Sequence, residues 1–81
     1  MTAPKVTIDD LVLVQIERDE DGPLLGGEDG LATRLLEWTI SQRIYGIGGH
    51  GHTGPDYFSA LYRTEDGARV RQWLSEQPET R

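Results

Sequence analysis

The sequence has no cysteine, and its apolar residues form only short runs. Without cysteine the chain has no disulfide bond, no thiolate zinc ligand and no thiol nucleophile. The longest apolar run, Leu11–Val14, is far shorter than the roughly 20 residues that a membrane-spanning helix needs. The first residues also lack the apolar stretch of a signal peptide, so we expect a soluble, cytoplasmic protein.

The chain is short. Its 81 residues suffice for one domain, because two domains would need roughly 100 residues or more. A chain of this length buries only about 60% of the surface that its unfolded form exposes, so its core is thin. We expect a flexible arm over residues 1–6, a single small globular domain over residues 7–76 and a frayed tail over residues 77–81. The sequence shows no internal repeat.

The acidic side chains are unevenly distributed. The formal net charge is −6, and residues 1–30 account for all of it, with eight acidic side chains against Lys5 and Arg18. Affinity for the DNA backbone comes mostly from cations that displace counterions, so an acidic protein is a poor non-specific DNA binder. The acidic half suits a basic partner surface and equally a solvated loop. The candidate partner patch comprises Asp19, Glu20, Asp21, Glu28 and Asp29.

The first element that the pattern predicts is a helix over residues 7–19. Thr7 opens a capping box that ends at Asp10, and acidic side chains at this position favour the start of a helix. Apolar side chains then follow at helical spacing, although the β-branched run over residues 11–16 also permits a strand. Residues 20–30 are rich in glycine and predict a turn-rich connection.

A second helix is predicted over residues 28–44, and the spacing of Val70, Trp73 and Leu74 predicts another near the C-terminus. Residues 64–67 are either the N-cap of that last helix or the turn before a strand. Residues 57–63 between these two helices fit either a helix or a strand, because their apolar side chains match both periods. These periodicities predict that both tryptophans share one core. The expected core residues are Leu11, Ile16, Leu31, Leu35, Trp38, Leu61, Val70 and Trp73.

Residues 46–54 contain five glycines and both histidines, which predicts a loop. The start of this loop matches the G-x-G-x-x-G pattern of dinucleotide-binding proteins. No βαβ unit surrounds the match, and Arg71 stands where a ribose-binding acid is expected, so we attribute it to chance. His50 and His52 lack a third metal ligand and a nucleophile pattern. We therefore expect no enzyme activity and no cofactor.

The acidic turn resembles a 12-residue EF-hand calcium loop. Glu17, Asp19, Asp21 and Glu28 fall at loop positions 1, 3, 5 and 12, with a glycine at position 6 that permits the sharp turn. Glu17 departs from the aspartate that the family has at position 1, and the chain has no second loop to pair with. We therefore expect an acidic turn without a bound metal ion.

The longest resemblance is to winged-helix transcriptional regulators. Residues 10–18, the Gly22-Pro23-Leu24 turn and residues 30–37 are similar to the first two helices of PadR-type repressors. The C-terminal part aligns either with the PadR-type recognition helix and first wing strand or with the last wing strand and following helix of MarR-type regulators. The resemblance implies a helix-rich α+β domain of winged-helix type, with about three helices and a short β-hairpin.

In such a fold a helix enters the DNA major groove and arginines contact phosphates. We therefore expect a small non-enzymatic regulator that binds DNA as a homodimer. The residues that would contact DNA, or another partner, are Arg34, Arg43, Arg63, Arg69 and Arg71. The alternative is an acidic protein-binding module, such as a phage-type inhibitor or accessory factor, that engages a basic partner surface. A single EF-hand-like calcium binder is the third alternative. We expect no membrane partner.

Overall fold

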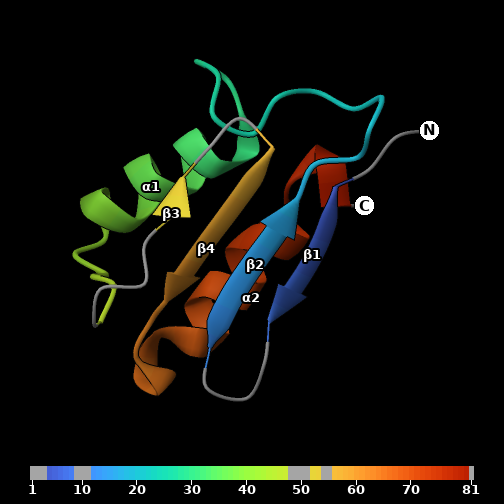
Figure 1. Cartoon of the computed structure of the whole chain (residues 1–81). Helices are drawn as coiled ribbons and strands as arrows, with labels where there is room; N and C mark the ends of the chain where they lie inside the picture. The colour runs from blue at the N-terminus through green and yellow to red at the C-terminus, as the bar shows by residue number, and fades with distance from the viewer. Residues whose placement is uncertain (1–3, 9–11, 48–51, 54–55, 81) are drawn as a thin grey trace.

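The computed structural model describes residues 4–8, 12–47, 52–53 and 56–80. This part of the chain is an α+β domain, in which a four-stranded antiparallel sheet carries two α-helices on one face (Figure 1). The α+β class is confirmed. The order of the strands across the sheet is β1-β2-β4-β3.

The segment expected to be the first helix contains two strands instead. β1 (Lys5–Ile8) pairs with β2 (Leu13–Glu17), so the helix predicted over residues 7–19 is wrong. The reason is a burial pattern with a period of two, because Val14 and Ile16 are fully buried while their neighbours along β2 are more exposed. The capping-box aspartates lie outside the described residues.

The ambiguous segment after residue 56 is a strand. β4 (Tyr57–Leu61) pairs with β2 in the centre of the sheet, and the two-residue β3 (His52–Thr53) pairs with its other side. Phe58 and Ala60 point into the core, opposite Ile16 and Val14 of β2. A third helix is therefore not formed over residues 57–61, and β3 and β4 form an antiparallel pair within a larger sheet, so the winged-helix topology is not confirmed.

The two α-helices are those expected later in the chain, although both are shorter. α1 (Leu31–Ser41) follows β2, and α2 (Gly67–Ser75) follows β4 after a short 3-10 turn, η1 (Thr64–Asp66). Each half of the chain therefore runs strand, strand, helix, an order that the sequence did not reveal as a repeat. In Figure 1 both helices lie behind the sheet, with α2 behind β2 and α1 behind β3.

The core lies between the sheet and the helices. Four of the expected core residues are fully buried, namely Ile16, Leu31, Leu35 and Val70. Trp38 of α1 and Trp73 of α2 are partly buried and stack with their ring centroids 5.4 Å apart, which confirms that the tryptophans share one core. Leu61 is half-buried on the sheet face away from the helices, and Leu11 lies outside the described residues.

Both ends of the described chain join the fold. Lys5 and Val6 already belong to β1, so the sheet begins inside the segment expected to be an arm. The C-terminal segment forms a short 3-10 turn, η2 (Pro78–Thr80), and Arg34 of α1 donates a hydrogen bond to Gln77 at 2.9 Å and pairs with Glu79. Residues 77–80 are therefore packed against α1 rather than frayed.

Within the described residues, neither helix has the length and apolar character needed to cross a membrane.

Candidate protein-binding surface

The loop between β2 and α1, residues 18–30, is held in place at both ends. At its start Arg18 donates hydrogen bonds to the carbonyl of Gly22 at 2.8 Å and to the carboxylate of Asp56 at 3.1 Å. The Arg18 backbone N–H also bonds the carbonyl of Asp56 at 2.8 Å. One arginine thus ties the acidic loop to the segment that enters β4.

At its end the loop closes over the first turn of α1. The carbonyl oxygen of Leu25 accepts hydrogen bonds from the backbone N–H groups of Ala32 at 3.1 Å and Thr33 at 3.4 Å. These groups have no partner within their own helix, so the loop itself caps α1. Gly30 permits this contact, because a Cβ atom at this position would lie 2.2 Å from the Leu25 carbonyl oxygen.

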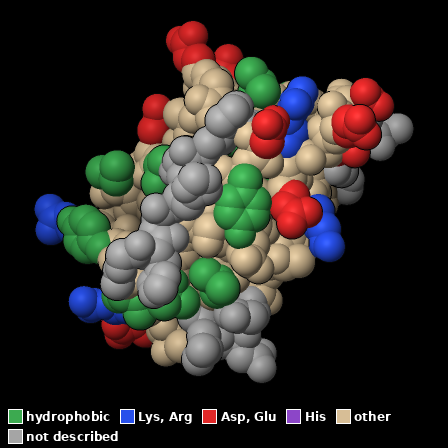
Figure 2. Space-filling view, in the orientation of Figure 1, with side chains coloured by type: hydrophobic (Ala, Val, Ile, Leu, Met, Phe, Trp, Pro, Cys, Tyr) green, Lys and Arg blue, Asp and Glu red, His purple; other side chains and the backbone are tan. Residues whose placement is uncertain are grey.

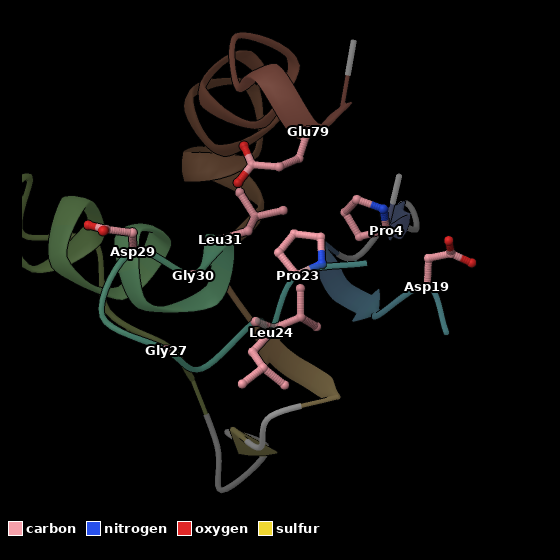
Figure 3. Close-up of a pocket in the computed structure, with 10 residues that line it drawn as sticks. Pro4, Asp19, Pro23, Leu24, Gly27, Asp29, Gly30, Leu31 and Glu79 are labelled. Atoms are coloured by element: carbon pink, nitrogen blue, oxygen red, sulfur yellow. The ribbon is translucent and has the colours of Figure 1, made fainter. Parts of the chain in front are cut away.

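The capped loop forms a hollow with a volume of about 220 Å³. Figure 3 shows Pro4, Pro23 and Leu31 facing one another, with Leu24 from the loop beside them. Leu24 keeps 50% of its surface exposed. The hollow therefore offers uncovered apolar surface.

Carboxylates stand around this apolar hollow. Asp19 and Asp29 from the two ends of the loop and Glu79 from η2 line its edge, and Figure 3 shows the carboxylates of Asp19 and Asp29 pointing outward. Glu79 pairs with Arg34, whereas no ion pair of the described residues involves the five residues of the candidate partner patch. Figure 2 shows most acidic side chains of that view along its top, where this loop lies. We call the hollow and this patch the acidic end.

The acidic end does not have the architecture of an EF-hand. Glu17 is the last residue of β2, so a strand stands where the resemblance requires a helix. No group of three or more acidic or histidine side chains within the described residues is arranged to hold a metal ion. The carboxylates are therefore distributed over a surface rather than gathered around one point.

The expected DNA-binding arginines lie on the two helices and next to them. Arg34 is held by Gln77 and Glu79 next to the acidic end. Arg69 donates a hydrogen bond to Gln42 at 2.7 Å, and Arg63 lies 3.8 Å from Glu65. The Arg71 guanidinium lies close to Gly67 in the first turn of α2. One of its nitrogens would be 2.8 Å from a Cβ atom at that glycine.

Arg43, the fifth of these arginines, is exposed just beyond the end of α1.

Sequence reasoning missed a further surface, the sheet face away from the helices. Its side chains are half-buried or exposed, and Gln15 of β2 donates a hydrogen bond to the hydroxyl of Tyr57 on β4 at 3.0 Å. The alternation of polar and apolar residues along β2 indicates a strand with one exposed face, but this segment was assigned to a helix. Of the glycine-rich loop, His50 lies outside the described residues and His52 belongs to β3.

No protein-family model, curated protein or solved structure matches the chain. The resemblance to winged-helix regulators therefore stays a prediction.

Proposed function

We propose that this protein is a non-enzymatic binding module whose acidic end engages a basic, partly apolar segment of a partner protein. The observation that carries the proposal is the apolar hollow with Leu24 half exposed and carboxylates on its edge. Exposed apolar surface with polar groups around it is typical of sites that bind another protein.

The chemistry of the hollow defines the segment that fits it. Apolar walls gain free energy when they are removed from water, at about 25 cal/mol per Å². Asp19 and Asp29 at the edge attract cations and repel anions. A lysine or arginine next to an apolar side chain satisfies both requirements, because its aliphatic stem covers apolar surface while its charged head reaches a carboxylate.

The loop is also prepared for binding. The contacts of Arg18 and of the Leu25 carbonyl fix both its ends before a partner arrives. A partner then loses less affinity to the ordering of the loop. This preorganisation supports a binding role over that of a solubilising loop.

The winged-helix regulator remains the alternative. Its contacts to DNA phosphates would come from Arg63, Arg69 and Arg71, which lie on or next to α2. We rank it second because Arg63 and Arg69 already interact with Glu65 and Gln42. The cytoplasmic location belongs to the proposal in either form.

A peptide titration tests the proposal. The probe is a fluorescein-labelled 12-residue peptide of lysine, leucine and glycine, and its anisotropy is followed as protein is added. The Leu24→Ser variant should weaken binding about fivefold, since a half-exposed leucine has roughly 1 kcal/mol of transfer free energy left to gain. Asp29→Asn should weaken binding and reduce its dependence on salt.

Two matched controls carry the same chemical changes elsewhere on the surface. Ile40→Ser removes an exposed apolar side chain at the far end of α1, and Glu37→Gln removes one exposed carboxylate. Both should bind the peptide as the unmodified protein does. Equal losses in all four variants, or binding of a labelled DNA duplex with no binding of the peptide, would contradict the proposal.

A further inference from the structure

A second group of exposed apolar side chains lies at the other end of α1. Ile40 and Tyr45 keep 67% and 62% of their surface exposed, and Ile47 is exposed as well. Arg43 stands between them in the sequence. We call residues 40–47 the basic end. α1 begins at the hollow and ends here, so its 11 residues separate the two surfaces by about 16 Å.

The basic end is built around a left-handed residue. The backbone N–H of Ile44 donates to the carbonyl of Thr39 at 2.9 Å, and that of Arg43 donates to Ile40 at 3.1 Å. This pair of bonds is the Schellman pattern that ends helices, in which glycine usually takes the left-handed position. Arg43 takes it here with φ of 59°. A non-glycine residue pays a conformational penalty there, and such strain concentrates at functional positions.

The charge of Arg43 is not neutralised within the described residues. Its neighbour Gln42 is engaged by Arg69, and the three ion pairs of the described chain involve other arginines. Arg43 therefore presents a cation with apolar side chains on both sides of it. This is the kind of segment that the acidic end is proposed to bind.

We infer that the acidic end of one molecule binds the basic end of a second copy of this chain. The inference rests on the proposed function and names a partner for the same hollow. The two ends are complementary in apolar surface and in charge, because the apolar walls would meet Ile40 and Tyr45 while Asp29 would meet Arg43.

The association is head-to-tail. Each molecule carries one acidic and one basic end on opposite ends of α1, so a bound pair leaves one free surface of each kind. Such contacts lead to open chains or closed rings rather than to a single two-fold pair. The contact is small, which places the association in the weak range of interfaces.

Two charge-reversed variants test this geometry. Asp29→Arg breaks only the acidic end, and Arg43→Asp breaks only the basic end, at a backbone conformation that aspartate tolerates. Sedimentation equilibrium is measured for each variant, for the unmodified protein and for an equimolar mixture of the variants, from about 10 μM to about 1 mM in low salt. Circular dichroism confirms that each variant is folded.

The unmodified protein should gain mass with concentration, and high salt should reverse the gain. Each variant alone should associate at least about tenfold more weakly. The mixture should associate more strongly than either variant alone, since the intact basic end of Asp29→Arg fits the intact acidic end of Arg43→Asp.

A monomeric unmodified protein throughout this range would overturn the inference, as would unchanged association of either variant or a mixture that stays monomeric. The peptide titration keeps the two proposals apart. The peptide could bind the unmodified protein but not Asp29→Arg, while the unmodified protein stays monomeric. In that case the acidic end binds basic segments, but not the basic end of this chain. If neither peptide nor second copy binds, both proposals fail.

Discussion

Arg43 holds a position that helices usually give to glycine. Its left-handed backbone closes α1 through the hydrogen bonds of Arg43 and Ile44 to the last turn. The side chain adds no ion pair within the described part of the chain. A cation at this end also interacts favourably with the helix dipole, so its effect on stability is a separate question from the proposed binding role.

Replacing this arginine by glycine should stabilise the fold. Arg43→Gly removes the steric cost of the left-handed conformation, and we expect the free energy of unfolding in urea to rise by about 1 kcal/mol. Gln42→Gly is the control, because Gln42 has ordinary right-handed geometry and glycine there should lower stability. A loss of stability in Arg43→Gly would mean that the side chain supports the fold.

Gly30 determines whether the acidic loop can close on α1. Gly30→Ala would place a Cβ atom 2.2 Å from the Leu25 carbonyl oxygen, so the loop must move and the helix loses its cap. We expect a loss of more than about 2 kcal/mol in urea unfolding, together with weaker peptide binding. Gly27→Ala is the control, since its nearest contact would be an ordinary 4.0 Å from Leu24. Equal stability of both variants would contradict the capping geometry.

Tyr62 makes the stability depend on alkaline pH. Burial raises the pKa of Tyr62 above its usual value of 10.0, and the hydroxyl of Thr39 opposes part of the shift. The folded protein therefore keeps this proton when the unfolded chain has begun to lose it, so the free energy of unfolding falls as the pH rises above 10.

The variant Tyr62→Phe should lose part of this alkaline decline. The slope of the unfolding free energy between about pH 8 and about pH 11 should be shallower in Tyr62→Phe than in the unmodified protein. An identical slope in Tyr62→Phe would show that its hydroxyl titrates as in the unfolded chain.

At the scale of elements, the stacked tryptophans join the two helices. Trp38 and Trp73 approach to 5.4 Å with an angle of 21° between their rings. Offset aromatic pairs contribute about 0.5–1.5 kcal/mol beyond the area they bury. A double-mutant cycle with Trp38→Leu and Trp73→Leu should give a coupling energy of this size in urea unfolding. Strict additivity of the two changes would mean that the stack does not hold α1 to α2.

The helices and the pairing of the tryptophans were predictable because their apolar residues recur at helical spacing over a full helix length. The first two strands were not, since each is only four or five residues long and their side chains fit both periods. What decides between the periods is the pairing of β2 with β4, in which the partner residues are 40 to 48 positions apart in the sequence. The local pattern of apolar and polar residues gives no information on which distant segment pairs with β2.

The candidate site was predictable only in part. The acidic side chains of residues 19–29 were visible as a charged turn, and they line or surround the hollow. The hollow itself was not visible, because it also requires Pro4 from the start of the chain and Glu79 from its end. Folding brings these distant segments together around Leu24 and Leu31.

At the scale of the whole molecule, charge and exposed apolar surface are arranged along α1. Carboxylates surround the hollow at the start of this helix, and Arg43 with its apolar neighbours stands at its end. Figure 2 shows the same separation, with most acidic side chains along the top and exposed apolar side chains next to basic ones at the left. A molecule with two unlike ends can bind a basic partner or its own copies through the same hollow.

The central claim is that the acidic end is the binding surface, and an amide NMR titration with the lysine-leucine peptide tests it most directly. At protein concentrations low enough to avoid self-association, the account predicts shift changes confined to residues 19–31 and 78–80, with Leu24 and Leu25 among the largest. Residues 42–47 and 62–71 should stay unchanged. Shift changes centred on those residues, or none at saturating peptide, would contradict the account.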